Sequence, residues 1–169
     1  SREELADAGV NLVRDAAIYS PNTQFSDFTA RKLSNPRFRG IGSSPANPSI
    51  TTYFDGVPQL NSNTSSIDLL EVEQVEFVRG PQSALFGRNT LAGVINVSSM
   101  RPSLGEWTHS LSVPLSNFGS RDVRASVSGP LVADRVGVSG TIGFSRRAGF
   151  TRNLVTGRDI DSREALSGK

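Results

Sequence analysis

The chain has 169 residues, of which 36% are hydrophobic, with a mean hydropathy of −0.25 and a formal net charge of +2. No apolar run approaches the roughly 20 residues that a transmembrane helix needs, and the absence of cysteine excludes disulfides and thiolate metal sites. The arginines are scattered and form no basic stripe, so we expect no nucleic-acid partner.

Two short helices are predicted at the start of the chain. Ser1 and Glu4 have the spacing of a capping box, and Gly9 is placed to end the first helical turn. Asn11 is predicted to cap a second helix. The apolar face of that helix is formed by Leu12, Val13, Ala16 and Ala17.

Strand and turn signals follow these helices. We predict strands near Arg37–Ile41 and at Ile50–Phe54, and Asp55-Gly56 is a strong hairpin signal. Polar loops rich in Ser, Asn and Pro are predicted at residues 43–49 and 59–66. Short helices mixed with a few strands indicate a small α+β domain.

A stretch punctuated by glycines then joins two further strands. The first strand breaks at Gly80-Pro81, and Pro81 is predicted to be the first residue of a helical turn, where its missing N–H costs nothing. Gly87 ends that turn, and Gly93 leads into the second strand.

This stretch resembles the plug-domain signature of TonB-dependent outer-membrane receptors, written IEVxRGPxSxLYGxxAxGGVINIxT. Here Phe86 stands for Tyr, and Leu91-Ala92-Gly93 stands for a Gly-Gly pair. Two upstream stretches match the same family in the same order: Phe38-Arg39-Gly40-Ile41-Gly42 and Tyr53-Phe54-Asp55-Gly56-Val57-Pro58. The resemblance implies a plug domain with a small mixed sheet and short helices, which we assign to residues 1–102.

Beyond Pro102 the pattern changes to alternation with a period of two, in Ser110–Pro114, Asp122–Ser128 and Arg135–Arg147. The apolar positions share one face: Val123, Ala125, Val127, Val136, Val138, Ile142 and Phe144. Taken alone, this alternation favours a half-buried soluble sheet, because the signal of each barrel segment is weak. Because a plug signature precedes it, we interpret residues 103–169 as the first antiparallel strands of an incomplete transmembrane β-barrel. Residues 148–160 are then an outer loop, and 161–169 enter a fourth strand.

The resemblance also implies roles for particular residues. Arg39 and Arg79 match plug arginines that anchor the plug to carboxylates on the barrel wall; those partners lie beyond Lys169, so both arginines are expected to be unpaired here. Five glycines are expected to have structural roles: Gly40, Gly56, Gly80, Gly87 and Gly93. Ligand contact is expected from the apical plug loops; the alternative is that these loops only connect strands. The residues expected to contact the ligand are Ser43, Ser44, Pro45, Ala46, Asn47, Gln59, Leu60, Asn61, Ser62 and Asn63.

The sequence does not indicate an enzyme. His109 is the single histidine, and no spacing of acidic residues indicates a shared catalytic or metal site, so we expect no catalytic residue, metal or cofactor. The resemblance implies a receptor in the Gram-negative outer membrane, in contact with its lipid. It would take up a scarce nutrient such as a ferric siderophore, an extracellular metal chelate. The resemblance also implies that the plug would gate the barrel lumen and that the TonB energy-transducing complex would act through a segment outside this sequence. The alternative is a soluble periplasmic α+β ligand-binding module without a membrane barrel.

Overall fold

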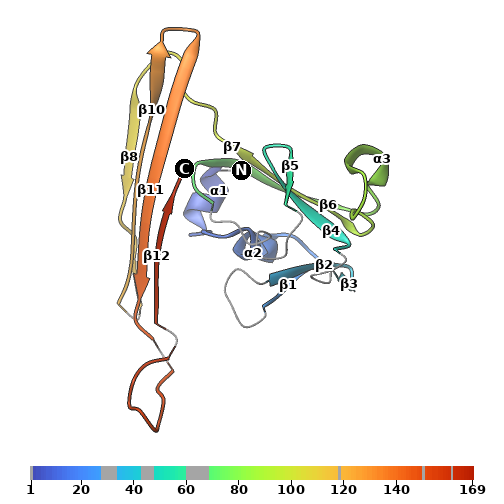
Figure 1. Ribbon diagram of the computed structural model, residues 1–169, viewed down its shortest axis with the longest axis vertical. Helices are drawn as coiled ribbons and strands as arrows, with labels where there is room; N and C mark the ends of the chain where they lie inside the picture. Colours follow the sequence, from blue (N-terminus) through green and yellow to red (C-terminus); the bar gives the residue numbers. More distant parts are fainter. Residues whose placement is uncertain are drawn as a thin grey trace. The chain divides into compact units, whose positions relative to one another are not determined.

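The computed structural model describes residues 2–27, 34–42, 48–59, 69–117, 119–149, 151–160 and 162–169 (Figure 1). The chain divides into two compact units, Ser1–Met100 and Arg101–Lys169, two residues before the boundary predicted from the sequence. Among the described residues, no helix is both long enough and apolar enough to cross a membrane.

The first unit contains three short α-helices, one 3-10 helix and seven strands among its described residues. In chain order they are α1 (Arg2–Asp7), α2 (Val13–Ala16), η1 (Ala17–Tyr19), β1 (Thr23–Asp27), β2 (Ser34–Phe38), β3 (Ile41–Gly42), β4 (Ile50–Phe54), β5 (Val57–Gln59), β6 (Val72–Arg79), α3 (Ser83–Phe86) and β7 (Gly93–Ser99).

A four-stranded mixed sheet, in the order β5-β4-β7-β6, is the centre of this unit. β4 and β7 pair in parallel, and the other two pairs are antiparallel. One sheet face carries Ile95 and Val97, which are fully buried against Val13 of α2 and Phe38 of β2. Helix α2 and the second sheet therefore pack on that face, and their apolar side chains leave water together.

The second, three-stranded sheet has the order β1-β2-β3 and is antiparallel throughout. The single strand predicted near Arg37–Ile41 is wrong, because a turn at Arg39-Gly40 divides this stretch between β2 and β3. Both turn residues have positive φ (50° and 81°), which ends the extended backbone. β1 was not predicted from the sequence, because its residues, Thr-Gln-Phe-Ser-Asp, include a single large apolar side chain.

Two local details of the helices also differ from the prediction. The N-cap of α2 is Leu12, without a side-chain capping hydrogen bond, and not Asn11. α3 begins at Ser83 after the N-cap Gln82, so Pro81 precedes the helix and is not its first residue. Gly87 does end α3, with φ 73°. Ser1 lies outside the described residues, and the predicted capping box with it.

The second unit is an antiparallel sheet in the order β12-β11-β10-β8, with β9 also paired to β10. Its strands are β8 (Thr108–Ser112), β9 (Leu115–Ser116), β10 (Ser120–Val132), β11 (Val136–Arg147) and β12 (Arg163–Gly168). Figure 1 shows β10 and β11 as a long hairpin. A short turn joins β10 to β11, whereas a long loop joins β11 to β12. These strands do not close a barrel within this chain.

Candidate functional site

The two motif arginines are brought to one turn of the first unit. Arg39 follows β2 and Arg79 ends β6, 40 residues later in the chain. The backbone N–H of Arg39 donates to the carbonyl of Asn22 (3.0 Å), and Nη1 of Arg79 donates to the carbonyl of Pro21 (2.6 Å). Both arginines are exposed. The successive carbonyls of Pro21 and Asn22 thus connect the two motif segments.

This contact corrects the expectation that Arg79 has no partner in this chain. Asn22 has a positive φ (58°), and the turn that it forms directs the Pro21 carbonyl at the end of β6. One backbone carbonyl uses one of the five guanidinium N–H donors, so most of the fork remains available to a carboxylate. The anchoring role of Arg39 and Arg79 stays a prediction.

Close backbone approach between β6 and β7 depends on Gly93. All five signature glycines have positive φ, and at Gly93 the value is 149°. A Cβ at Gly93 would lie 2.2 Å from the Val78 carbonyl oxygen and 2.7 Å from the Phe38 ring. The Phe38 ring also makes an edge contact with Phe77, with centroids 6.3 Å apart. Gly93 therefore allows the segment that carries Arg39 to pack under the end of β6.

The Tyr53–Pro58 motif secures the other face of the central sheet. The hydroxyl of Tyr53 donates to the carbonyl of Phe86 at 2.6 Å, and the two rings meet edge-on at 5.1 Å. Asp55, whose φ is 49°, accepts from the backbone N–H of Ser99 at 2.7 Å and from its hydroxyl at 2.5 Å. Asp55 was predicted from the sequence only as part of the Asp55-Gly56 hairpin turn, and Tyr53 only as part of the motif, so neither hydrogen bond was foreseen.

An exposed polar network lies on the same sheet face. Glu76 of β6 accepts from the side-chain amides of Gln74 (2.7 Å) and Asn96 (2.9 Å). Each carboxylate oxygen accepts one of these hydrogen bonds, so the network fixes the direction of the three side chains. Among the described residues, no group of three or more His, Cys, Asp or Glu could hold a metal ion.

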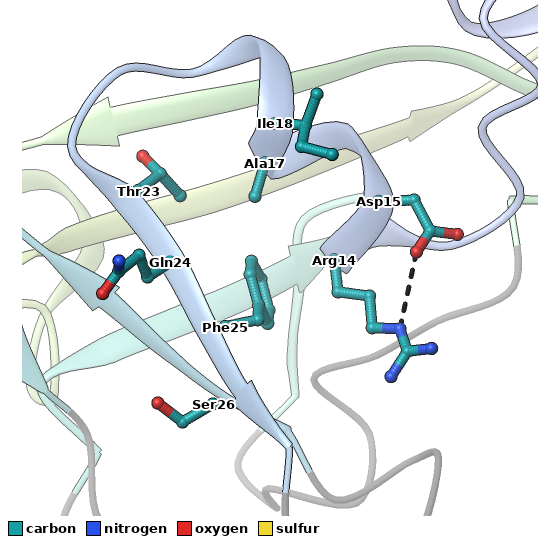
Figure 2. Close-up of a pocket in the computed structure, with 8 residues that line it drawn as sticks. All are labelled: Arg14, Asp15, Ala17, Ile18, Thr23, Gln24, Phe25 and Ser26. Atoms are coloured by element: carbon teal, nitrogen blue, oxygen red, sulfur yellow. Dashed lines mark ion pairs between the residues drawn. The ribbon is translucent and has the colours of Figure 1, made fainter.

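A pocket of about 590 Å³ opens between the α2–η1 segment and β1 (Figure 2). Nε of Arg14 and Oδ1 of Asp15 form an ion pair at 3.5 Å on one side of it, and Phe25 and Ile18 contribute apolar surface. Both charged side chains are partly exposed. The pocket contains none of the residues that the sequence singled out for ligand contact or anchoring.

Most of the predicted ligand-contact positions lie outside the described residues: Ser43, Ser44, Pro45, Ala46, Asn47, Leu60, Asn61, Ser62 and Asn63. Gln59 is described, as the last residue of β5, and its side-chain amide donates to the Val57 carbonyl at 3.2 Å. That local bond follows the hairpin and does not point to a ligand. The ligand-binding assignment of these loops stays a prediction.

The second unit has two chemically different faces. In the β10–β11 register Val123 pairs with Phe144, and Ala125 pairs with Ile142. The same face carries Leu111 of β8 and Leu166 of β12, residues that are 71% and 74% exposed. The opposite face carries polar contacts, namely the Ser110–Ser126 hydroxyl pair (2.7 Å) and the Asp122–Arg124 ion pair (3.1 Å). An exposed apolar face backed by a polar one is what a lipid-facing barrel wall requires.

The class of protein that these units define is a plug-type domain followed by wall strands of a membrane receptor. The "TonB-dependent Receptor Plug Domain" family matches residues 1–94, which is more than half of the chain. The chain therefore belongs to this family of TonB-dependent receptors, and its location is the outer membrane of a Gram-negative bacterium. The relatives are receptors and not enzymes, in agreement with the sequence analysis.

Individual relatives agree with this assignment. The chain is 36% identical over 104 residues to the pesticin receptor of Yersinia pestis. The matched region covers 60% of this chain and 15% of that receptor. It is 25% identical over 136 residues to the ferrioxamine B receptor of Salmonella typhimurium, covering 78% of this chain and 19% of the other. The crystal structure of the ferric yersiniabactin uptake receptor FyuA of Yersinia pestis superposes with a TM-score of 0.85 at 29% identity, over 99% of this chain and 27% of that one.

The chain thus spans less than a fifth of the length of these two curated relatives. The alternative of a soluble periplasmic binding module is not supported, because the relatives are outer-membrane receptors and the second unit exposes many large apolar side chains on one face.

Proposed function

We propose that this chain is the plug and the first wall strands of a receptor for energised uptake of a ferric chelate of the siderophore class. In this proposal residues 1–102 form the plug that gates the lumen, and residues 103–169 begin the surrounding barrel. The observation that carries the proposal is the match of residues 1–94 to the plug family, followed at once by strands with one apolar and one polar face.

The ligand is proposed from the relatives. The names of three of them refer to ferrioxamine, ferrioxamine B and ferric yersiniabactin, all of which are iron chelates. Residues 43–47 and 59–63 supply hydroxyl and amide groups without net charge, which can hydrogen-bond to the oxygen-rich periphery of such a chelate.

The energy source is proposed to be the TonB complex. It would act on the plug through a segment outside residues 1–169 and rearrange the plug within the lumen. Arg39 and Arg79 would hold the resting plug by forked hydrogen bonds to wall carboxylates, a geometry for which guanidinium is well suited. The bond of Arg79 to Pro21 is compatible with this role, since it uses a single donor.

The proposal is tested by iron uptake. The whole receptor is expressed in a Gram-negative strain that lacks its own siderophore receptors, and cells are given radioactive iron bound to ferrioxamine-type or yersiniabactin-type chelates. We expect uptake of at least one chelate, and we expect its loss in a matched strain without TonB. Uptake that persists without TonB, or the absence of uptake and of binding for every ferric chelate, would refute the proposal.

A further inference from the structure

An unusual row of charged residues lies at one end of the apolar face in the second unit. Arg121 of β10 and Arg146 of β11 are cross-strand partners, and Arg146 is also the partner of Glu164 of β12. All three side chains are exposed. Each lies two residues along its strand from Val123, Phe144 or Leu166, which form the next row of side chains on the same face. The charged row therefore borders the apolar surface directly.

The two arginines of this row are not neutralised by the described part of the chain. Neither guanidinium makes a hydrogen bond or an ion pair with another described residue. Asp122, the acid next to Arg121 in sequence, is on the polar face and holds Arg124 through two hydrogen bonds at 3.3 and 3.1 Å. Like charges directly opposite each other across two strands destabilise a sheet. Glu164 can offset one charge of the row, which leaves a net charge of +1.

The position of the row along the strands identifies the side of the membrane. The row lies at the end of β10 and β11 that leads into the long 148–160 loop, and the short β10–β11 turn lies at the other end. Barrels in outer membranes have short periplasmic turns and longer extracellular loops. The two arginines consequently lie where the apolar band meets the headgroups of the outer leaflet.

We propose that Arg121 and Arg146 form a binding site on the outer wall for a lipid whose headgroup carries a phosphate monoester. Two adjacent guanidinium groups present parallel N–H donors to the oxygens of one dianionic phosphate, and this relieves their mutual repulsion. The acyl chains of the lipid lie along Val123, Phe144 and Leu166. The site rests on the proposed barrel, but it does not depend on which ligand the receptor transports.

The test measures retained lipid. The whole receptor is folded into phosphatidylcholine vesicles that contain a small fraction of phosphatidic acid, a monoester, or of phosphatidylglycerol, a diester. Lipid that remains bound after mild detergent extraction is counted by native mass spectrometry. We expect the wild type to retain phosphatidic acid in preference to phosphatidylglycerol, and free inorganic phosphate not to displace it.

Four variants separate the site from general surface charge. Arg121→Gln/Arg146→Gln should lower phosphatidic acid retention by about fivefold per arginine, so about 25-fold together. Arg135→Gln removes one arginine charge at the other end of the hairpin and should leave retention unchanged, where loss of a single arginine from the row costs about fivefold. Glu164→Gln removes the competing carboxylate and should raise retention. Arg121→Lys/Arg146→Lys should retain an intermediate amount, because an ammonium group is not a planar fork.

Equal retention by the wild type and the double glutamine variant would overturn the proposal, as would an equal loss in Arg135→Gln. Equal retention of phosphatidic acid and phosphatidylglycerol would refute a site specific for a phosphate monoester and would indicate charge attraction alone. Displacement by inorganic phosphate would indicate a site for a soluble anion. A wild type that does not fold into any vesicle would instead refute the barrel on which the proposed function rests, whereas a receptor that transports iron but shows no lipid preference would refute this inference alone.

Discussion

Replacement of Gly93 by alanine tests how the plug is held together. The added Cβ would lie 2.2 Å from the Val78 carbonyl oxygen and 2.7 Å from the Phe38 ring, and the φ of 149° disfavours any L-residue. Backbone strain of this kind costs about 1–3 kcal/mol, and overpacking costs a further 1–3 kcal/mol. The expected loss of about 2–6 kcal/mol is a large share of the roughly 5–15 kcal/mol that stabilises a typical domain.

Gly56→Ala is the matched control for Gly93→Ala. Gly56 also has a positive φ (81°), but nothing lies within 4 Å of the position that its Cβ would occupy. Its cost is therefore backbone strain alone, about 1–2 kcal/mol. Urea denaturation of residues 1–102 measures the stability of both variants. It is monitored by far-ultraviolet circular dichroism, because the single tryptophan, Trp107, lies outside this segment. With a slope of about 1.5 kcal/mol/M, a loss of 4 kcal/mol lowers the midpoint by more than 2 M.

Equal midpoints for the two alanine variants would refute the reasoning, because they would mean that the neighbours of Gly93 move aside at no cost. A midpoint for Gly93→Ala that is lower than that of Gly56→Ala, with an unchanged slope, is the expected result. A change in slope would indicate a different denatured or native state and would call for a comparison by amide exchange.

Three further predictions address the two units and the arginine anchor. Residues 1–102 expressed alone should form a compact unit with protected amides in β4 and β7; uniformly fast exchange would mean that the plug needs its barrel to fold. Val138→Arg should lower folding yield in lipid vesicles by the equivalent of a few kcal/mol, whereas Ser139→Arg on the polar face should be tolerated; equal yields would refute the barrel assignment. Arg79→Ala should cost the isolated plug about 0.5–1 kcal/mol in thermal melting, through loss of the bond to Pro21. In the whole receptor it should also raise the protease sensitivity of the plug, and unchanged sensitivity would refute anchoring.

Much of the fold was predictable because its signals are local. The glycines of the signature can be recognised from sequence since positive φ is accessible to them at low cost, and all five have it. The strand predicted at Ile50–Phe54 forms with those bounds, and the segment predicted at Arg135–Arg147 from apolar side chains at a period of two forms β11, which begins one residue later at Val136. Two strand predictions were wrong. β1 was not predicted because its residues carry no alternating apolar pattern, and the strand predicted at Arg37–Ile41 is interrupted by a turn at Arg39-Gly40.

The candidate sites were decided by pairing between distant segments, which a local pattern does not encode. The parallel pairing of β4 with β7 joins strands about 40 residues apart, and the turn at Pro21-Asn22 reaches Arg79 from 58 residues away. Likewise, alternation places Arg121 and Arg146 on the apolar side of their strands, but only the register of the hairpin sets them opposite each other. The sequence alone determined the family, the two-unit organisation and the faces of the strands. The tertiary structure determined which side chains meet, because a shift of one residue in register would place every side chain against a different neighbour.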